Sequence, residues 1–341
     1  MRKKRAYLRS VRSEVSLMNM ITAEWTFGRI RALPVFRGVE EYIVPLSGEH
    51  SEETAQTPLS FFNELGWAPD GIIDGFMRIG EILEAGKRVV FPFWTEEELR
   101  ADPSMSQRYL IHFPAEKKTP FILLAAGGAY REVASMIESF PACSEINDAG
   151  YHAFSLNYRV GAAARAPHPV EDMAAALRFI FAHAEELNVE KEGFAVGGFS
   201  AGGHLAAAFG TESLGWKQYG LPRPAAEILA YPVVTMGENS HAESRWNLLR
   251  EQACDKAARA MWSVEKQVTA AYPPTFLWQC ERDCSVSIEN SRLMADALER
   301  TDVPLVYETF DSDVHGWGSG RGTPAEGWVA RAVDFWRRNA E

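Results

Sequence analysis

One stretch of the chain places a serine among closely spaced glycines in a setting suited to nucleophilic catalysis. Residues 194–205 read FAVGGFSAGGHL, in which Gly198, Ser200 and Gly202 fit the pattern G-x-S-x-G. An apolar run precedes the serine and an alanine-rich run follows it, which predicts a strand that turns sharply into a helix. Such a turn needs small residues and would expose the serine hydroxyl at the carboxyl end of the strand. We expect Ser200 to be a nucleophile; the alternative is a glycine-rich packing turn.

A serine hydroxyl is a weak nucleophile near neutral pH, so Ser200 needs a base, and the base needs an acid that orients it. The histidines that follow in the chain are His204, His241 and His315. His204 is too close to the serine in sequence, and His241 lies in a polar stretch after a predicted strand. His315 lies in a glycine-containing loop after the last predicted strand. We expect His315 to be the base, with a surface histidine as the alternative.

The orienting acid should follow the predicted strand before the last one, because this type of turn is associated with the chain order serine, acid, histidine. Asp283 lies just past the end of an apolar run, and Glu281 is its local competitor. Asp311 and Asp313 are too near the histidine in sequence. We expect Asp283 to hold the His315 tautomer and to stabilise the imidazolium.

A second glycine-rich segment, AGGAY, follows the apolar run FILLA and could bind an oxyanion. Small residues allow backbone N–H groups to approach a ligand closely, and a tetrahedral intermediate needs such donors. We expect the donors to be the N–H groups of Gly128, Ala129 and Ala201; a simple strand-to-helix turn is the alternative. Tyr130 and Trp317 adjoin this site and could stack on a sugar ring or an aromatic acyl group, or only line an apolar wall.

These residues require a scaffold in which parallel strands end at one edge. From about residue 108, apolar runs typical of buried parallel strands alternate with helical patterns such as Pro169–Glu186 and Pro324–Asn339. The alternation predicts an α/β fold with a mostly parallel central sheet and helices on both faces. The predicted strands are Arg108–Phe113, Phe121–Ala126, His152–Tyr158, Phe194–Gly198, Glu227–Val234, Pro274–Cys280 and Pro304–Phe310.

The catalytic domain is expected to span residues 105–341, with additions before and within it. Residues 20–104 carry no catalytic motif, and we expect this segment to pack on the catalytic domain or to cap it. Within it, Gly71–Lys87 is a predicted helix, Glu41–Leu46 a possible strand, and 47–58 a polar loop. An insertion with helical character, Met236–Pro273, is a second cap-like segment.

The charge distribution excludes some classes of partner. The 341 residues carry a formal charge of −11. Within residues 1–19, which we expect to form a disordered extension, six basic residues fall in the first twelve positions. The remaining chain has 29 basic and 46 acidic residues. A body this acidic argues against nucleic acid and against an anionic membrane surface as partners.

Other sequence patterns bear on the compartment of the protein and on metals and cofactors. No stretch approaches 18 consecutive apolar residues, so no membrane span is expected. The four cysteines and the lack of a clean signal sequence favour reduced thiols and a cytoplasmic protein. Neither H-E-x-x-H nor a phosphate-binding P-loop occurs, and we expect no metal and no cofactor.

Several segments together resemble a known family. The chain is similar to α/β-hydrolases of the esterase/lipase group with an H-G-G-G-type oxyanion loop, and more narrowly to bacterial acetyl esterases and acetylxylan or feruloyl esterases. The resemblance covers about residues 105–340 and implies catalytic roles for Ser200, Asp283 and His315. The matching segments are Gly127–Tyr130, Asn157–Arg159, Gly198–Ala206, Tyr231–Val233, Ser244–Leu249, Glu265–Val268, Pro273–Leu277, Glu289–Ser291 and His315–Gly316.

The chain departs from the family pattern at four positions. Ala126 stands where the group often has His or Pro, and Ala129 replaces the third oxyanion glycine. Both positions act through the backbone, so activity is compatible with either change. Arg282 and Ser287 replace a frequent acid and a common proline around the expected catalytic acid.

The motifs and the resemblance lead to one expected function and two alternatives. We expect a cofactor-independent serine esterase that forms an acyl-enzyme and acts on short-chain esters, above all acetyl esters. As the resemblance implies, the alcohol could be a sugar or an oligosaccharide. One alternative is an amidase or peptidase such as a formamidase, because the same triad serves amides. The other is a non-catalytic ligand-binding protein on a hydrolase scaffold.

Overall fold

An eight-stranded sheet forms the centre of the protein in a computed structural model that describes residues 21–46 and 51–340. The strand order is β1-β2-β4-β3-β5-β6-β7-β8; β2 is antiparallel to both of its neighbours, and the strands from β4 to β8 run parallel. This confirms the predicted α/β class. The strands are β1 Val90–Pro92, β2 Tyr109–Phe113, β3 Phe121–Ala125, β4 His152–Asn157, β5 Ala195–Phe199, β6 Ala226–Ala230, β7 Thr275–Cys280 and β8 Leu305–Phe310.

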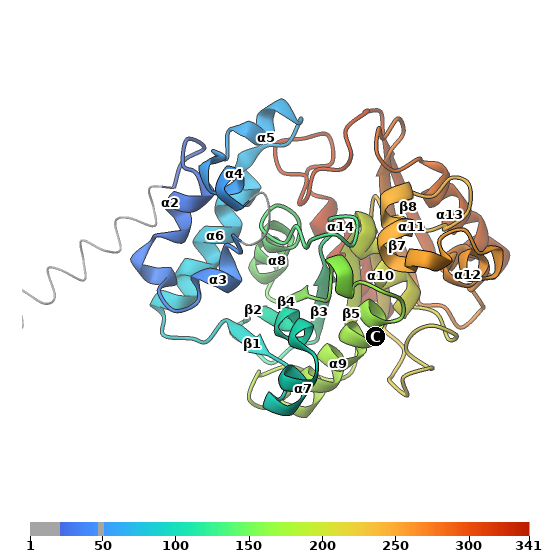
Figure 1. Cartoon of the computed structure of the whole chain (residues 1–341), viewed down its shortest axis with the longest axis horizontal. Coiled ribbons are helices and arrows are strands. Elements are labelled where there is room, and N and C mark those ends of the chain that lie inside the picture. The colour runs from blue at the N-terminus through green and yellow to red at the C-terminus, as the bar shows by residue number, and fades with distance from the viewer. Residues whose placement is uncertain (1–20, 47–50, 341) are drawn as a thin grey trace, which may run out of the picture.

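Helices cover both faces of the sheet (Figure 1). Strands β2 to β7 are buried except at the last residue of β4, because both of their faces are covered, and their nearly continuous apolar sequences reflect this. One face packs on α9, α10 and α13, and the opposite face packs on α8 and α14. The bounds of these helices are α8 Ser139–Asp148, α9 His168–Ala182, α10 Ser200–Phe209, α13 Glu289–Arg300 and α14 Trp328–Ala340.

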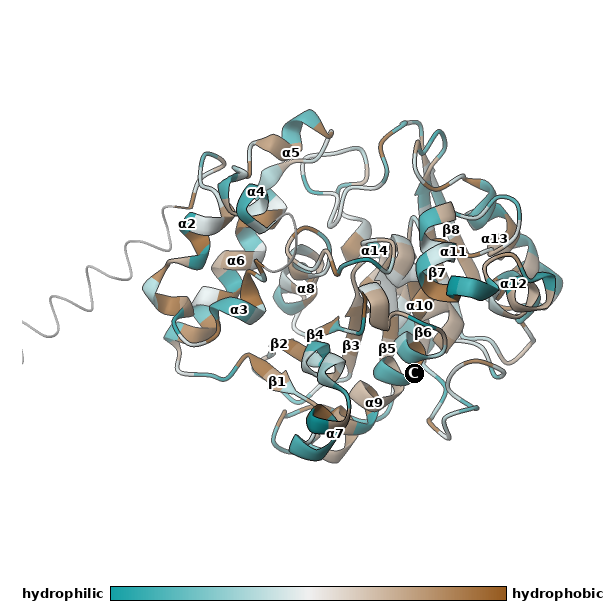
Figure 2. Cartoon of the chain, viewed as in Figure 1, coloured by the Kyte–Doolittle hydropathy of each residue, from teal (hydrophilic) through white to brown (hydrophobic). Residues whose placement is uncertain are grey.

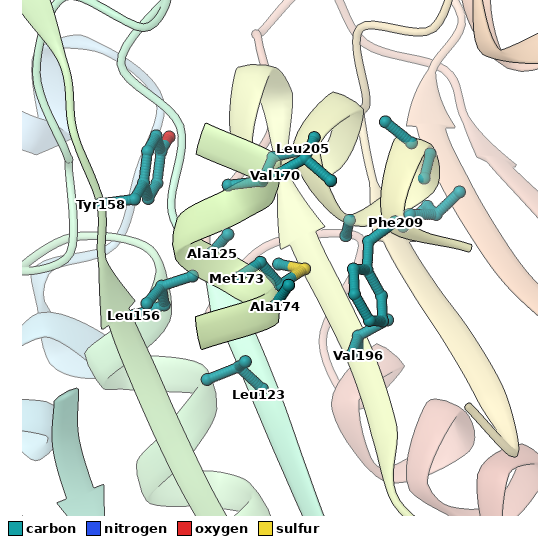
Figure 3. Packing of buried hydrophobic residues seen from close by; sticks show 14 of the residues in the cluster. Leu123, Ala125, Leu156, Tyr158, Val170, Met173, Ala174, Val196, Leu205 and Phe209 are labelled. Carbon is teal, nitrogen blue, oxygen red and sulfur yellow. The ribbon is translucent and has the colours of Figure 1, made fainter. Parts of the chain in front are cut away.

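The core beside α9 and α10 shows how the apolar positions of strand and helix meet. Leu123 of β3 and Val196 of β5 point toward Met173 of α9 and Leu205 of α10 (Figure 3). Figure 2 shows the apolar residues concentrated along the central strands, whereas α7 at the periphery is largely hydrophilic. The sheet is therefore a rigid platform whose carboxyl edge can hold loops in fixed positions.

Residues 21–46 and 51–84 form a helical layer outside α8. Helix α6 crosses α8 so closely that a Cβ at Gly75 would lie 3.0 Å from the backbone of Phe140. After α6 the chain enters the sheet, because β1 pairs with β2 at the edge. The helices of this layer are α2 Phe27–Arg31, α3 Glu40–Ile43, α4 Ser51–Gln56, α5 Phe61–Glu64 and α6 Pro69–Glu84.

Two local predictions in this layer are wrong. The run Glu41–Leu46 is not a strand, because α3 begins at Glu40 and the carbonyl of Val39 accepts bonds from the N–H groups of Tyr42 and Ile43. The segment predicted as a polar loop contains α4. Burial of Ile43 and Val44 within a helical cluster accounts for the apolar residues that suggested a strand. The extension predicted for residues 1–19 lies outside the described residues.

The insertion after β6 is helical, as its sequence indicates. It contains α11 Ala242–Leu249 and α12 Lys256–Trp262, which lie near β7 and α13 in Figure 1. The remaining elements are α7 Glu96–Ala101 and the short 3-10 helices η1 Pro34–Phe36, η2 Pro103–Gln107, η3 Gly161–Ala163, η4 Arg250–Gln252 and η5 Val264–Lys266.

Candidate active site

Ser200 lies at a sharp turn between β5 and α10. Its φ is +50°, in the left-handed region that residues other than glycine rarely adopt, and α10 begins at this residue. The glycines on either side are required by space. A Cβ at Gly198 would lie 2.2 Å from the carbonyl oxygen of Gly202, and a Cβ at Gly202 would lie 2.2 Å from that of Ala125. The G-x-S-x-G pattern is thus explained by the geometry of the turn.

The structure brings Ser200, His315 and Asp283 together. The distance from His315 Nε2 to Ser200 Oγ is 2.9 Å, and the distance from His315 Nδ1 to Asp283 Oδ2 is 2.8 Å. The His315 side chain is 24% exposed, whereas that of Asp283 is fully buried. This is the connectivity in which a base contacts a nucleophile while an acid fixes the orientation of the base.

Asp283 is held by its own turn after β7. Its Oδ1 accepts hydrogen bonds from the backbone N–H groups of Ser285 and Val286, both at 2.9 Å. Its Oδ2 accepts a further bond from Gln279 Nε2 at 3.2 Å, and Ser291 in turn donates to Gln279. These donors fix the carboxylate so that it faces the imidazole.

The other acids considered from the sequence lie apart from the imidazole. Glu281 accepts a bond from Thr309 Oγ1 at 2.9 Å, and Asp311 pairs with Arg282. The backbone of Asp313 accepts a bond from Cys284 N–H, which joins the acid turn to the loop that carries the histidine.

That loop, residues 311–322, is called the histidine loop below, and it reaches the N-terminal helices (Figure 1). A Cβ at Gly318 would lie 3.1 Å from the Trp67 ring, and a Cβ at Gly66 would lie 2.8 Å from a methyl group of Val314. An ion pair between Arg321 and Asp74 of α6 adds a polar contact. The helical layer therefore supports the loop that presents the histidine.

Residues 126–132 after β3 form the expected oxyanion segment. Gly128 has a φ of +114° and Ala129 of +55°, and the Gly128 carbonyl accepts a bond from Arg131 N–H at 2.9 Å. Asn247 of α11 donates from Nδ2 to the Ala129 carbonyl at 2.9 Å, which holds the turn from outside. Gly128 and Ala129 are half-buried, while the buried Ala201 is the second residue of α10. A helix leaves its first N–H groups without intrahelical partners, so Ala201 N–H can donate to a ligand.

The other two histidines have structural positions. His204 is buried. Its Nδ1 shares a 2.8 Å hydrogen bond with the Tyr130 hydroxyl, and its Nε2 shares one of 2.8 Å with the Trp262 carbonyl. Burial lowers its pKa to about 4, so it is neutral. His241 caps α11 through a 3.3 Å bond from Ser244 N–H to Nδ1. Burial and the neighbouring His315 lower the pKa of His241.

The two aromatic residues considered for substrate stacking are both buried. Tyr130 is 1% exposed, and Trp317 stacks on Trp278 with ring centroids 6.2 Å apart. The exposed aromatic residue near the oxyanion segment is Trp246 of α11, at 56% exposure. One helical turn earlier, Glu243 forms a 3.1 Å ion pair with Arg131 of the oxyanion segment. The spacing of three residues puts Glu243 and Trp246 on the same face of α11.

Two further residues of the site, Glu138 and Tyr231, have no motif of their own. Glu138 is buried and accepts a bond from Gly127 N–H at 2.5 Å. Tyr231 follows β6, and its ring lies 5.2 Å from that of His315, between centroids. Tyr231 lies within the predicted strand Glu227–Val234 and in the matching segment Tyr231–Val233, which could have drawn attention to it, whereas Glu138 carries no such signal.

Neither a membrane-crossing helix nor a metal-binding cluster is found in the described part of the chain. None of its helices combines the length and apolar character needed to cross a bilayer. No group of three histidine, cysteine or acidic side chains within residues 21–46 and 51–340 is arranged to hold a metal ion.

The sequence and fold are similar to those of proteins that act on esters and xylan. The BD-FAE family model matches residues 110–217. The chain is 32% identical over 262 residues to endo-1,4-beta-xylanase B of Butyrivibrio fibrisolvens, covering 73% of this chain and 41% of that protein. It is 31% identical over 203 residues to an acetylxylan esterase of Xylanibacter ruminicola, covering 57% and 40% of the two chains. The chain thus spans less than half the length of either relative.

One solved structure is matched over nearly its whole length, unlike the two relatives above. An acetyl ester-xyloside bifunctional hydrolase from Caldicellulosiruptor lactoaceticus aligns with a TM-score of 0.65 and 30% identity, over 73% of this chain and 95% of that one. A carboxylesterase from Lactobacillus plantarum aligns with a TM-score of 0.58 at 23% identity, which supports the fold alone.

Proposed function

The chain belongs to the α/β-hydrolase family of serine esterases, and on that premise we propose that it hydrolyses carboxylic esters of carbohydrates through an acyl-enzyme on Ser200. The observation that carries the proposal is the linked contact from Ser200 Oγ to His315 Nε2 and from His315 Nδ1 to Asp283. No other arrangement of nucleophile, base and acid in the described residues is as complete.

In the proposed reaction, Ser200 Oγ attacks the ester carbonyl while His315 Nε2 takes its proton. Asp283 stabilises the imidazolium, and the N–H groups of Gly128, Ala129 and Ala201 bind the oxyanion. His315 then gives the proton to the departing alkoxide. Water attacks the acyl-enzyme with His315 again acting as base, and the carboxylic acid leaves while the serine regains its proton.

The proposed substrate is a short acyl ester, above all an acetyl ester, of a sugar or oligosaccharide. Support comes from the acetylxylan esterase and the acetyl ester-xyloside hydrolase among the similar proteins. The exposed indole of Trp246 adds support from the site itself, since a flat apolar ring beside the oxyanion segment can stack on the C–H face of a sugar.

An activity screen tests the proposal. Wild-type protein should hydrolyse p-nitrophenyl acetate faster than longer acyl esters, and it should release acetate from acetylated xylo- or manno-oligosaccharides. Ser200→Ala should abolish turnover, whereas Ser213→Ala, at an exposed serine bonded to Gln267, should leave it unchanged. Full turnover by Ser200→Ala would refute the proposed nucleophile.

Two alternatives give different results in the same screen. Faster hydrolysis of N-formyl or peptide substrates than of any ester would assign the site to amides. Failure of the folded wild-type protein to react with a fluorophosphonate probe would favour a non-catalytic binding protein.

A further inference from the structure

A buried carboxylate near the candidate triad bonds to the oxyanion segment and to Tyr231, which in turn contacts the histidine loop. Glu138 is 5% exposed, immediately precedes α8, and bonds to the oxyanion segment on one side and to Tyr231 on the other. We propose that Glu138 is a positioning residue that fixes the oxyanion segment and the histidine loop relative to each other. The proposal rests on the esterase function proposed above.

On the oxyanion side, Glu138 Oε2 accepts the N–H of Gly127 at 2.5 Å. A bond from an amide to a charged acceptor is short and strong, so it holds the Gly127 peptide in one orientation. Gly127 also lies against the nucleophile, since a Cβ placed there would be 2.8 Å from Ser200 Cβ. The orientation of this peptide sets the direction of the Gly128 and Ala129 N–H groups that follow it.

On the histidine side, Glu138 acts through Tyr231. The Tyr231 hydroxyl accepts the N–H of Gly318 at 3.2 Å and donates its single proton to Glu138 Oε1 at 3.1 Å. The Tyr231 ring is edge-on to His315, and a Cβ at Gly316 would lie 2.3 Å from that ring. The same carboxylate therefore links two segments that are distant in sequence, and it can do so fully only when both of its oxygens accept.

The protonation of Glu138 adds a chemical consequence. Burial raises its pKa to about 7, against the opposing effects of the Gly127 N–H, the His315 charge and the Tyr231 hydroxyl. The titratable groups that face it are His315, Tyr231 and Tyr158, and the carboxylate in turn raises the pKa of Tyr158. Near neutral pH the Glu138 carboxyl ionises. The charged form strengthens its hydrogen bonds to Gly127 and Tyr231 and favours the imidazolium that forms during reaction.

Glu138→Gln keeps the size of the side chain and removes the charge. We expect kcat for p-nitrophenyl acetate at pH 8 to fall about 10- to 100-fold, with KM changed less than about threefold, because ground-state binding is not affected. Between pH 8 and pH 5, the wild-type profile of kcat should contain a step from protonation of Glu138 that is absent from the profile of Glu138→Gln. The matched control is Glu227→Gln, at another fully buried glutamate of raised pKa, which lies within β6 and should retain wild-type kcat and pH profile.

Tyr231→Phe gives an independent test, since it removes the hydroxyl that bonds to Glu138 and Gly318 and keeps the ring. We expect a fall in kcat of about 10-fold, and we expect the double variant Glu138→Gln/Tyr231→Phe to be no worse than Glu138→Gln alone, because both changes break one chain of contacts. Additive losses, or a Glu138→Gln enzyme with wild-type kcat and pH profile, would overturn the proposal.

The two proposals fail in different ways. If wild-type protein hydrolyses no ester, the proposed function is wrong. If wild-type protein is an active esterase and Glu138→Gln equals it in kcat, in pH profile and in the rate of fluorophosphonate labelling, only the positioning role is wrong.

Discussion

Several residues around the carboxyl edge of the sheet, Ser200, Ala129 and Tyr130 among them, adopt backbone conformations that residues with a side chain normally avoid. Ser200, Ala129 and Tyr130 all have φ between +50° and +57°. Each such residue costs on the order of 1–3 kcal/mol and persists only where its surroundings impose it. At Ser200 the result is a hydroxyl that projects from the turn toward His315. At Ala129 and Tyr130 the chain turns back over the serine, with Asn247 and His204 holding the two residues from outside.

Trp246 is the residue at which the proposed sugar specificity is most directly tested. Trp246→Ala should raise KM for an acetylated xylo-oligosaccharide by about 10-fold, because about 1–2 kcal/mol of ring contact is lost. The same change should leave KM for p-nitrophenyl acetate within about twofold, since that substrate has no sugar to stack. Steady-state kinetics with both substrates measure the difference.

Met261→Ala is the control for this experiment, because Met261 is an exposed apolar residue of α12 with a similar exposure of 54%. An equal rise in KM for both substrates in Trp246→Ala, or the same effect in Met261→Ala, would argue against a stacking role.

At the scale of elements, the N-terminal helices and the histidine loop form one unit. Contacts at Gly66, Trp67 and Gly71 reach Val314, Gly318 and Ser319, and the Asp74–Arg321 pair adds to them. The imidazole is carried by a loop that has no regular hydrogen-bonded ladder of its own. Its position therefore depends on what packs against it.

Trp67→Ala tests this dependence. The half-buried indole should cost about 2–3 kcal/mol of unfolding free energy when truncated. Because the histidine loop loses its packing contact with the Trp67 ring, kcat should also fall about 10-fold at a temperature where the variant remains folded. Denaturant unfolding and p-nitrophenyl acetate kinetics measure the two effects.

Phe36→Leu separates a local effect from a global one. Phe36 is buried against Phe76 in the same helical layer and should lose about 1 kcal/mol of stability without a change in kcat. If Trp67→Ala lowers stability and leaves kcat unchanged, the helical layer does not position the histidine.

The predictable part of the fold is the part whose sequence pattern has one physical cause. Strands such as β3 and β7 are buried on both faces, so a continuous apolar run identifies them within a residue or two. The turn at Ser200 is equally readable, because only glycine fits at positions 198 and 202.

Other features depend on contacts that a linear pattern does not contain. Helix α3 is only Glu40–Ile43, and its apolar residues pack into a core cluster without forming a strand of the sheet. The burial of Tyr130 follows from a bond to His204, and the position of Glu138 follows from bonds to Gly127 and Tyr231. Such partners are set by tertiary packing, so spacing along the chain could not place these side chains.

At the scale of the whole molecule, one acid in the central sheet is expected to lower the free energy of unfolding. Glu227 lies in β6 between Val196 and Thr275, is 0% exposed, and its carboxyl oxygens have no hydrogen-bond partner within the described residues. Burial raises the pKa of Glu227 well above its ordinary value, which favours the neutral carboxyl in the folded protein. The unfolded chain loses this proton more readily than the folded chain.

This difference sets the sign of a pH effect. Below pH 4.5 both states hold the proton and the group has no effect on stability; as the pH rises, the unfolded state ionises first and is favoured. Glu227→Gln should therefore raise the free energy of unfolding by about 1–3 kcal/mol at pH 8 and by less at pH 5. Urea unfolding at the two pH values measures it. A variant less stable than wild type at pH 8 would contradict the expected ionisation.

The contact between the helical layer and the histidine loop joins regions from opposite ends of the chain. The central strands can pair before this contact forms, since β3, β4 and β5 are contributed by the middle of the sequence. Contacts between distant segments form slowly, because the chain between them must first be ordered. The contact between Trp67 and Gly318 closes a loop that contains the whole central sheet. We therefore expect activity to recover later than the sheet on refolding, so that enzyme turnover reports completion of the whole chain rather than of its core.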